Sequence, residues 1–339
     1  MITIKEISDR LGLSQTTVSN VVRGKTSEVS PKTVARVQAA LEQYHYVPNM
    51  SARTLAQKSS RIIGMILRYN AQKDENPLRD PFAGELLGGV EAAVRAAGYF
   101  LLVSAASSIG EVLHLIETWN IDGLVLVGFH EGENLQISSQ TKKPLVFIDC
   151  YFGPDAPAYS NVGLDDRAAA RRMTEYLIAK GHRGLAFLAD NRVGVDAQRW
   201  AGFCDALAAA GLPCGEEHFV PLAAEPEALP QSLAALPARR GALTALLFAS
   251  DYYAVRGIHF LQDHGCTVPG DFSVAGFDDN LLARHTRPRL TTIRQDPTAK
   301  GKAACAMLLD RIKHKTPAGQ HLVLETTLVE RDSVAPLAP

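Results

Sequence analysis

Seven short apolar runs, separated by helical patterns, restrict the fold of residues 61–339 more than any other feature. The runs are IIGMIL (62–67), FLLV (100–103), GLVLV (123–127), PLVFI (144–148), GLAFLA (184–189), TALLFA (244–249) and FSVAGF (272–277). Such uniformly apolar runs are typical of parallel strands buried on both faces. Hydrophobic residues recur at helical spacing in 82–97, 112–119, 166–179, 198–210, 253–264 and 299–312. The alternation predicts doubly wound parallel sheets covered by helices.

This α/β region is too long for one sheet with a single core, because domains usually contain about 100–200 residues. A polar stretch around Ser160 and Asn161 lies near its middle. Two similar lobes with a cleft between them are therefore expected. Open parallel sheets bind ligands beyond the carboxyl ends of their strands, so the cleft is the expected ligand site.

The net charge of −1 hides an uneven distribution of charge along the chain. Residues 1–60 contain eight lysine and arginine residues and four acidic ones, a formal charge of +4, which leaves −5 for the remainder. A small basic segment before a larger acidic one indicates an anionic partner for the basic segment.

The basic segment, residues 1–57, contains three short helical patterns. Thr3 with Glu6 has the form of a capping box, and Gly12 ends the first helix. Ser14 can cap the second helix, and Ser30 followed by a proline starts the third. Two short helices joined by a turn of about four residues with a glycine predict a helix-turn-helix motif.

The second helix, within LGLSQTTVSNVVRG (11–24), presents uncharged polar side chains. Gln15, Thr16 and Asn20 carry amide and hydroxyl groups that can pair with base edges, and no carboxylate is present to repel phosphates. In a helix-turn-helix, the second helix lies in the major groove. DNA binding is therefore predicted, and a small helical bundle with a polar surface is the alternative.

A possible short helix follows in YVPNMSARTLAQKSS (46–60). Asn49 can cap it, Arg53 can meet a phosphate, and Leu55 is an apolar side chain suited to wedge into a minor groove. An isolated helix this short is marginal in water. A flexible linker is the alternative interpretation.

The quoted stretches TIKEISDRLGLSQTTVSNVVRG, VSPKTVARVQAAL and YVPNMSARTLA resemble the lactose-repressor (LacI) family of bacterial transcription regulators. The body resembles the same family, and through it the periplasmic sugar-binding proteins, in DPFAGELLGGVEAAVRAAGY, VGLDDRAAARRMTEYLIAKGHR, RWAGF, FSVAGFDDN, RPRLTTIRQD and LVERDSV. The resemblance implies an N-terminal all-α helix-turn-helix domain, residues 1–57, with a hinge helix at about 49–57. Residues 58–339 form the effector-binding and dimerisation domain. Its first lobe spans about 61–161 and 293–320, and its second about 162–291 with the C-terminal segment.

The resemblance also implies a set of DNA contacts. Gln15, Thr16 and Asn20 match the positions that read bases, and Leu55 matches the hinge leucine. The candidate DNA-binding residues are Thr3, Ser14, Gln15, Thr16, Thr17, Ser19, Asn20, Arg23, Asn49, Ala52, Arg53 and Leu55. A homodimer would place two recognition helices in successive major grooves, so a pseudo-palindromic double-stranded operator is expected.

Arg199 in RWAGF and Asp278 in GFDD match family positions that bind the effector. A guanidinium and a carboxylate can each make two directional hydrogen bonds to a polyhydroxylated or heterocyclic ligand. The candidate effector-binding residues are Phe82, Asp149, Arg199, Asp251 and Asp278. Asp251 as a simple helix cap is the alternative, and Asp279 is expected to face solvent or a turn. These residues suit a sugar or a purine, and a sugar is favoured.

Other motifs favour no enzyme, cofactor or metal site. The sequence contains no GxGxxG after a strand and no HExxH, and its histidines form no ligand cluster. Its five cysteines, Cys150, Cys204, Cys214, Cys266 and Cys305, are scattered, so free buried thiols are expected. No signal peptide and no run of about 18 apolar residues is present, so a cytoplasmic protein is expected.

The combined features predict a sequence-specific DNA-binding regulator of transcription, a repressor controlled by a small-molecule effector, most simply a sugar or sugar derivative. One alternative is a solute-binding protein of a transport system, which would share the two-lobed body. Another is a DNA-binding regulator whose body docks a partner protein instead of a small molecule.

Overall fold

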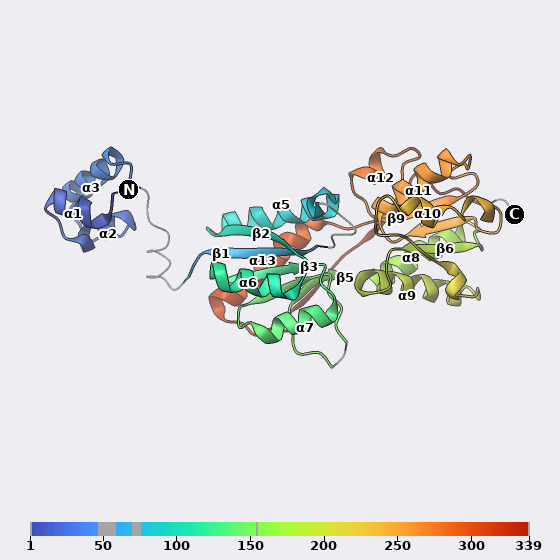
Figure 1. Cartoon of the computed structure of the whole chain (residues 1–339), viewed down its shortest axis with the longest axis horizontal. Coiled ribbons are helices and arrows are strands. Elements are labelled where there is room, and N and C mark those ends of the chain that lie inside the picture. Colours follow the sequence, from blue (N-terminus) through green and yellow to red (C-terminus); the bar gives the residue numbers. More distant parts are fainter. Residues whose placement is uncertain (1, 47–58, 70–75, 154, 338–339) are drawn as a thin grey trace. The chain divides into compact units, whose positions relative to one another are not determined.

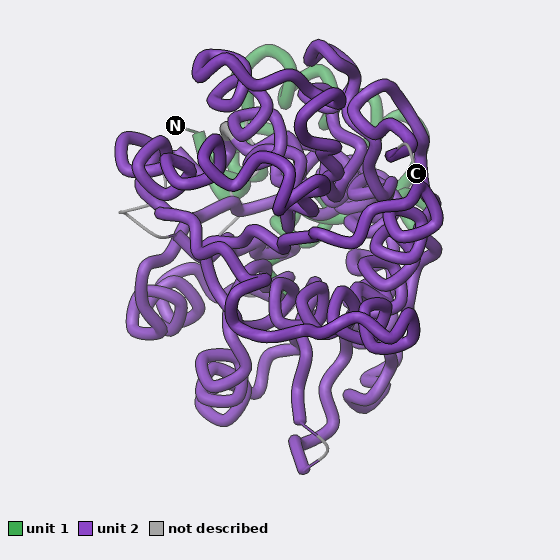
Figure 2. The backbone as a smooth tube through the Cα atoms, turned by 90° about the vertical axis from the view of Figure 1, so that its right-hand side faces the viewer, with its two compact units in different colours: residues 1–60 green, residues 61–339 purple. Residues whose placement is uncertain are grey.

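The computed structural model describes residues 2–46, 59–69, 76–153 and 155–337. The chain forms two compact units, residues 1–60 and 61–339, which Figure 2 shows in different colours. We call them the head and the body. Each has its own hydrophobic core, as the sequence predicts.

The described part of the head contains three helices, each preceded by a residue with a hydroxyl side chain. They are α1 (Ile4–Leu11), α2 (Gln15–Val22) and α3 (Pro31–Gln43). Thr3, Ser14 and Ser30 cap them by accepting hydrogen bonds from backbone amides three residues later. The core consists of Ile7, Val18, Val21, Val37 and Ala40. Gly12 adopts a left-handed conformation with φ of 63° and turns the chain from α1 to α2. The predicted helix-turn-helix arrangement is confirmed.

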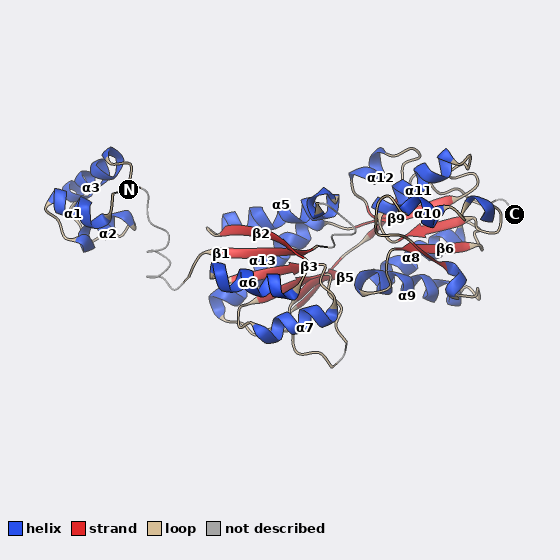
Figure 3. Cartoon of the chain, in the orientation of Figure 1, coloured by secondary structure: helices blue, strands red, loops and turns tan. Residues whose placement is uncertain are grey.

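The body has two lobes, each built on one sheet with helices on both faces (Figure 3). The first sheet is entirely parallel, in the order β11-β5-β4-β3-β1-β2. Its strands are β1 (Ile62–Arg68), β2 (Phe100–Ala106), β3 (Gly123–Val127), β4 (Leu145–Ile148), β5 (Asn161–Leu164) and β11 (His321–Leu324). The strand order reverses between β1 and β3, because β2 lies on one side of β1 and β3 on the other.

Two helices cover each face of the first sheet (Figure 1). The first pair is α5 (Pro81–Ala96) and α13 (Pro297–His314), and the second is α6 (Ile109–Trp119) and α7 (Glu131–Gln140). Successive side chains of β1 alternate between the faces: Met65 packs with α5 and α13, whereas Ile66 packs with α6 and α7. The two helices α5 and α13 approach closely at Gly89, where a Cβ would lie 2.3 Å from the carbonyl oxygen of Thr298.

The second sheet has the order β12-β10-β9-β8-β6-β7. Its strands are β6 (Leu185–Ala189), β7 (Phe219–Pro221), β8 (Ala245–Phe248), β9 (Ser273–Asp278), β10 (Thr291–Arg294) and β12 (Thr327–Val329). Only the pairing of β12 with β10 is antiparallel among these described strands. The order of this sheet reverses between β6 and β8.

Helices again cover both faces of the second sheet. One face packs on α8 (Asp166–Ala179) and α9 (Gly194–Ala209), and the other on α10 (Leu229–Leu233), α11 (Asp251–Asp263) and α12 (Leu281–His285). The described residues of the body also form three short 3-10 helices: η1 (Pro77–Arg79), η2 (Glu216–His218) and η3 (Pro237–Arg239). The doubly wound, two-lobed architecture predicted from the apolar runs is confirmed.

In the described chain, the backbone passes between the lobes after β5, after β10 and after β11. Residues 161–164 belong to the first sheet because β5 pairs with β4, and residues 291–294 belong to the second because β10 pairs with β9. The expected lobe boundaries at 161/162 and near 293 therefore fall inside these two strands. The chain crosses between the lobes after Leu164, the last paired residue of β5, and after Arg294, the last paired residue of β10.

The expectation of five free thiols is wrong for one pair. Cys204 and Cys214 form a disulfide, with their Cα atoms 5.5 Å apart. Cys204 lies on α9, and the chain reverses after this helix at Gly211, whose φ is 68°. This reversal brings the two thiols together. Cys150, Cys266 and Cys305 are free and buried, as expected.

No helix in the described ranges combines the length and the apolar character that crossing a bilayer requires.

Candidate functional site

The outward face of α2 carries uncharged polar side chains. Gln15 and Thr16 are exposed and Asn20 is half-buried, whereas Val18 and Val21 on the opposite face are buried in the head core. The first turn of this helix contains no acidic residue. Amides and hydroxyls in this arrangement can donate to and accept from base edges without repelling phosphates.

Other candidate DNA contacts take part in helix capping. Thr3 accepts a hydrogen bond from the Glu6 amide at 3.2 Å, and the Ser14 hydroxyl accepts one from the Thr17 amide at 3.0 Å. The hydroxyls of Ser14 and Thr17 lie 2.9 Å apart. Ser19 is half-buried, and Arg23 is exposed. The hinge candidates Asn49, Ala52, Arg53 and Leu55 lie outside the described residues.

A cavity of about 390 Å³ lies between the two lobes of the body. Residues 67–69, at the end of β1, and 127–128, at the end of β3, line it from the first sheet. Asp190 and Asn191, which follow β6, line it from the second sheet. Both sheets reverse their strand order beside these strands. The carboxyl edge at such a reversal is where open α/β sheets bind ligands.

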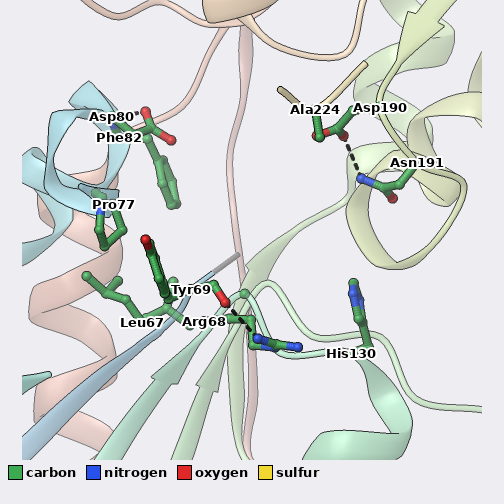
Figure 4. Close-up of a pocket in the computed structure, with 13 residues that line it drawn as sticks. Leu67, Arg68, Tyr69, Pro77, Asp80, Phe82, His130, Asp190, Asn191 and Ala224 are labelled. Carbon is green, nitrogen blue, oxygen red and sulfur yellow. Dashed lines mark hydrogen bonds between the residues drawn. The ribbon is translucent and has the colours of Figure 1, made fainter. Parts of the chain in front are cut away.

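The two walls of the cavity differ in chemistry (Figure 4). The first lobe contributes the rings of Tyr69 and Phe82, with Pro77 beside them, and the polar side chains of Arg68, Asp80 and His130. The second lobe contributes Asp190 and Asn191, whose side chains share a hydrogen bond of 2.7 Å. Aromatic faces bind the apolar side of a ring, whereas carboxylates bind hydroxyl groups. The volume lies toward the small end of the range of about 300–1,000 Å³ that is usual for ligand pockets.

Of the five effector-binding residues predicted from the sequence, Phe82 lines this cavity. Arg199 on α9 is 6% exposed, and its guanidinium carbon lies 3.5 Å from the centre of the Phe277 ring. Its Nε donates to Asp166 at 2.8 Å, and its Nη1 donates to the carbonyl oxygen of Ala249 at 2.5 Å. The structure thus ties Arg199 to three elements of the second lobe: α8, the end of β8, and β9.

Asp149 and Asp278 belong to a chain of polar contacts that joins the lobes. The Lys300 ammonium is fully buried and lies 2.7 Å from both carboxylate oxygens of Asp149 and from the Gln295 side-chain oxygen. The Gln295 amide nitrogen in turn donates to Asp278 at 2.7 Å. Asp149 follows β4 in the first lobe, and Asp278 ends β9 in the second. The Lys300 ammonium also lies 5.2 Å from the centre of the Phe82 ring.

A second polar connection crosses between the lobes at Asp166. The Tyr151 hydroxyl donates to the same Asp166 carboxylate that pairs with Arg199. Tyr151 follows β4 of the first lobe, whereas Asp166 begins α8 of the second. We call the joined residues Asp149, Tyr151, Asp166, Arg199, Asp278, Gln295 and Lys300 the inter-lobe cluster.

Asp251 and Asp279 are held inside the second lobe. Asp251 is fully buried and accepts hydrogen bonds from the Thr292 hydroxyl at 2.6 Å and the Asn280 amide at 3.1 Å. The expectation that Asp279 faces solvent or a turn is wrong: it is 3% exposed and pairs with arginines. The arginines are Arg284, Arg294 and Arg331. Three converging guanidiniums offset the cost of burying this carboxylate.

Three aspartates around the cluster have a backbone conformation that L-residues rarely adopt. Asp149, Asp278 and Asp279 have φ angles of 54°, 127° and 60°. Backbone strain of this kind gathers at functional sites, where the surrounding structure enforces it. The strain therefore points to the same region as the cavity does.

Burial dominates the electrostatics of the acidic residues in this region. Desolvation raises the pKa of Asp278 to about 7, against the opposing influence of Arg199. Desolvation also raises the pKa of Asp251, and the nearby Asp278 adds to that effect. The pKa of Asp149 is raised by desolvation, which the Lys300 ammonium partly offsets. Proton binding by these groups is therefore coupled to folding of the body.

Sequence reasoning missed most of the cavity lining. The missed residues include Arg68, Tyr69, His130, Asp190 and Asn191. Each lies at the end of an apolar run or within three residues of one, so polar residues directly after a predicted strand were the available signal. Pro77, Asp80 and Ala224 lie in connecting segments and carry no comparable signal.

The site offers binding groups and no metal cluster among the described residues. A head with a polar recognition helix and a body with a cavity between two lobes define the class of ligand-responsive DNA-binding regulators. Two family models match the chain accordingly. "Bacterial regulatory proteins, lacI family" matches residues 3–49, and "Periplasmic binding protein-like domain" matches residues 174–334.

Curated relatives match along nearly the whole chain. The HTH-type transcriptional repressor PurR of Erwinia tasmaniensis is 32% identical over 99% of this chain and 97% of its own length. The HTH-type transcriptional regulator CelR of Thermobifida fusca is 30% identical over 98% of both chains. The chain therefore belongs to the LacI family of bacterial regulatory proteins, and it is a DNA-binding regulator of transcription. The resemblance identified from the sequence is confirmed.

Solved structures agree with this assignment. The lac repressor dimer bound to operator and the anti-inducer ONPF has a TM-score of 0.85 at 25% identity, over 98% of this chain and 99% of that one. The complex of CelR with cellobiose has a TM-score of 0.74 at 27% identity, over 98% and 100% of the two chains.

Proposed function

We propose that this protein is a repressor whose affinity for its operator is set by a sugar or sugar derivative bound between the lobes. The observation that carries the proposal is the cavity at the strand-order reversals of both sheets, with aromatic rings on one wall and a carboxylate on the other. The cellobiose complex of the related CelR supports a sugar as the class of effector. Binding alone is assigned to the body, with no catalytic step.

In the DNA-bound state, Gln15, Thr16 and Asn20 read base edges in the major groove. The other head candidates position the helix on the phosphates. A homodimer presents two heads to a pseudo-palindromic operator, as in the lac repressor dimer solved on its operator. The hinge residues Asn49, Ala52, Arg53 and Leu55 are assigned to the minor groove between the half-sites. The protein acts in the cytoplasm, where its operator lies.

Effector binding is transmitted through the inter-lobe cluster. Phe82 contacts the ligand directly. Arg199, Asp278, Asp149 and Asp251, which do not line the cavity, hold its walls or turn toward the ligand when it binds. A ligand that contacts both walls favours one angle between the lobes. It shifts operator affinity only by the difference in its own affinity for the two states.

The proposal that an effector controls operator affinity is tested with the full chain and an operator obtained by selection from random duplexes. Fluorescence anisotropy follows operator binding while sugars are added. An effector should change operator affinity in the wild type, and Arg199→Met should abolish that response while leaving operator affinity intact. A variant that still responds at ordinary effector concentrations would remove Arg199 from the effector site.

The proposal that α2 reads base edges is tested by the substitutions Gln15→Ala, Thr16→Ala and Asn20→Ala. Each substitution should relax the preference at one operator position by about 1–3 kcal/mol, because one base contact is lost. Gln43→Ala, an exposed residue at the end of α3, is the matched control and should change nothing. If selection recovers the same site with all three variants, the recognition assignment fails.

A further inference from the structure

We propose that Cys204 and Cys214 are a site of reversible oxidation, at which a peroxide forms their disulfide and a dithiol opens it, so that the redox state of the pair controls the second-lobe wall of the cavity. The effect on the wall concerns the protein without ligand. The consequence for effector affinity rests on the proposed function, and it is measured separately.

The five cysteines of the chain differ in their access to solvent. Cys204 and Cys214 are half-buried, whereas Cys150, Cys266 and Cys305 are buried and free. Burial raises the pKa of the Cys150 thiol to about 12 and that of the Cys305 thiol to about 11. Because the thiolate is the form that attacks an oxidant, these two buried thiols are protected. An oxidant that reaches the protein is therefore directed to Cys204 and Cys214.

The location of the pair favours a switchable disulfide over a permanent one. The proposed function places the protein in the cytoplasm, where thiols are kept reduced and disulfides are usually transient and catalytic or redox-sensing. The disulfide spans ten positions within the second lobe. That lobe already has two large hydrophobic cores, so its fold does not depend on a short covalent link.

The oxidant is a peroxide, and the reaction proceeds in two steps. One thiolate attacks a peroxide oxygen: an S–O bond forms, the O–O bond breaks, and with hydrogen peroxide the products are a sulfenic acid and water. The second thiol then attacks the sulfenic sulfur, so that the S–S bond forms and the S–O bond breaks with loss of a second water. The two sulfurs lose two electrons to the peroxide, and the two thiol protons leave in the waters. A dithiol reverses the change by thiol–disulfide exchange and is itself oxidised to a disulfide.

The disulfide tethers the segment that holds Arg192. Cys204 lies on α9, and Cys214 lies two positions before Glu216 in η2. Glu216 pairs with Arg192 at 2.6 Å, and the guanidinium carbon of Arg192 lies 3.9 Å from the centre of the Phe219 ring. An exposed ion pair of this kind is weak by itself, so it fixes Arg192 only where Glu216 is itself held in place. The disulfide supplies that restraint.

Arg192 directly follows the residues that form the second-lobe wall of the cavity, Asp190 and Asn191 (Figure 4). The Asn191 amide nitrogen donates to Asp190 at 2.7 Å and to Asp196 at 2.8 Å, and the Asn191 side-chain oxygen accepts from the Val193 amide at 2.9 Å. The loop 190–193 is thus held by the first turn of α9 on one side and by the tethered segment on the other. Reduction of the disulfide removes the second restraint and should loosen the wall.

The oxidation is tested on the folded full chain. Reduced protein is treated with hydrogen peroxide, free thiols are blocked with iodoacetamide, and peptides are identified by mass spectrometry. The peptides that carry Cys204 and Cys214 should be joined, with the mass of two hydrogens lost, and dithiothreitol added to the folded protein should restore both thiols. A pair that stays reduced in peroxide, or a disulfide that the folded protein keeps in dithiothreitol, would overturn the proposal.

Hydrogen exchange of the ligand-free full chain tests the effect on the wall. Peptides that cover residues 190–193 and 214–219 should exchange about fivefold faster in the reduced protein than in the oxidised one, because local opening becomes easier. Peptides of the first lobe should exchange equally in both forms. Equal exchange of the 190–193 peptides in the two redox states would overturn the control of the wall.

The double variant Cys204→Ala with Cys214→Ser is the matched control, since it keeps the three buried cysteines and all methionines. It should exchange like the reduced wild type, and neither peroxide nor dithiothreitol should change its exchange. A double variant that still responds to peroxide in the 190–193 peptides would assign the effect to another residue and overturn the proposal. The comparison of reduced with oxidised wild type uses one chain and does not depend on how the variant folds.

The consequence for the effector is measured by isothermal titration calorimetry with glucose, ribose, cellobiose and hypoxanthine. If the reduced wall adopts its binding conformation about a third of the time, Kd of a compound that binds should be about threefold higher for the reduced protein. A compound that binds both forms equally would overturn the control of affinity and leave the proposed function intact. If no compound binds either form while exchange of the wall still follows the redox state, the small-molecule function fails and the oxidation site stands.

Discussion

The helix caps of the head join residues three positions apart in sequence, whereas the ion pairs of the inter-lobe cluster join residues far apart. Each described helix of the head is capped across three positions: Thr3 with Glu6, Ser14 with Thr17 and Ser30 with Thr33. In the body, Lys300 reaches Asp149 across 151 positions and Arg199 reaches Ala249 across 50. The caps of the head are exposed, and the contacts of Lys300 and Arg199 are largely or fully buried.

This difference determines how each region responds to change. An exposed cap contributes about 0.5–2 kcal/mol, because water can replace much of what is lost. A buried pair that loses one member leaves a charge without compensation, at a cost of about 3–5 kcal/mol. The head can therefore vary its recognition residues one at a time, whereas the walls of the cavity depend on each other.

The largest effect is expected for Lys300→Met. The substitution leaves the Asp149 carboxylate buried without its cation, so the free energy of unfolding of the body should fall by about 3–5 kcal/mol. Urea unfolding followed by tryptophan fluorescence measures it, because the two tryptophans of the chain, Trp119 and Trp200, both lie in the body.

Two matched variants distinguish the loss of the Lys300–Asp149 ion pair from the general effect of replacing a lysine on α13. Lys302→Met, two residues along α13 at an exposed position, should be nearly neutral. Lys300→Met combined with Asp149→Asn should recover most of the lost stability, since neither member of the pair then carries a charge and asparagine tolerates the positive φ of this position. A loss below about 1 kcal/mol for Lys300→Met alone would break the contrast between head and body.

The same contrast explains what could be predicted from the sequence. Hydrophobic periodicity and the spacing of Ser14, Ser30 and Gly12 predict the head almost element by element, because its caps and turns are local. The apolar runs likewise predict seven of the twelve described strands of the body. The strands β5, β7, β10, β11 and β12 are shorter or more polar and were not predicted. The cavity depends on which strand ends meet, and that order follows from tertiary pairing: Tyr69 and Asp190 face one cavity although 121 positions separate them in the chain.

The second effect concerns pH and Asp278. Desolvation raises the pKa of Asp278 to about 7, so the folded body binds this proton more tightly than the unfolded chain does. Its contribution to stability is therefore present at low pH and is lost as pH rises toward 7, by about 1.4 kcal/mol per pH unit. Asp278→Asn removes the titration. As the pH rises from 5 to 8, the free energy of unfolding of the variant should increase by roughly 2–3 kcal/mol relative to that of the wild type.

The measurement is urea unfolding of both proteins at a series of pH values, and only the difference between them is interpreted. Groups that titrate in both proteins and do not interact with Asp278 cancel in that difference. Asp251 does not cancel: Asp278 helps to raise the pKa of Asp251, so its loss acts in the same direction as the expected gain. Asp263→Asn, at an exposed position on α11, should show no such trend. A variant that instead becomes less stable than wild type as pH rises would show that Asp278 is stabilised in its charged form.

Two errors of the sequence reasoning have the same origin as the missed cavity residues. The sequence next to Asp279 does not predict its pairing with Arg294 and Arg331, because these arginines lie 15 and 52 positions away. Cys204 and Cys214 are closer, ten positions apart, yet their pairing depends on where α9 ends and how the chain reverses. The spacing of these residues in the sequence therefore predicted neither the arginine pairs of Asp279 nor the disulfide.

The smallest effect is expected in the head, for Ser14→Ala. Loss of its hydrogen bond to the Thr17 amide should lower the stability of the head by about 1 kcal/mol, because the freed amide can bond to water. Hydrogen exchange of head peptides in the full chain measures this loss, and Ser27→Ala in the exposed turn before α3 is the control. If the substitution weakens operator binding by more than the lost stability of the head can explain, Ser14 also contacts a phosphate. A loss as large as that of Lys300→Met would mean that exposed local caps and buried long-range pairs do not differ in this molecule.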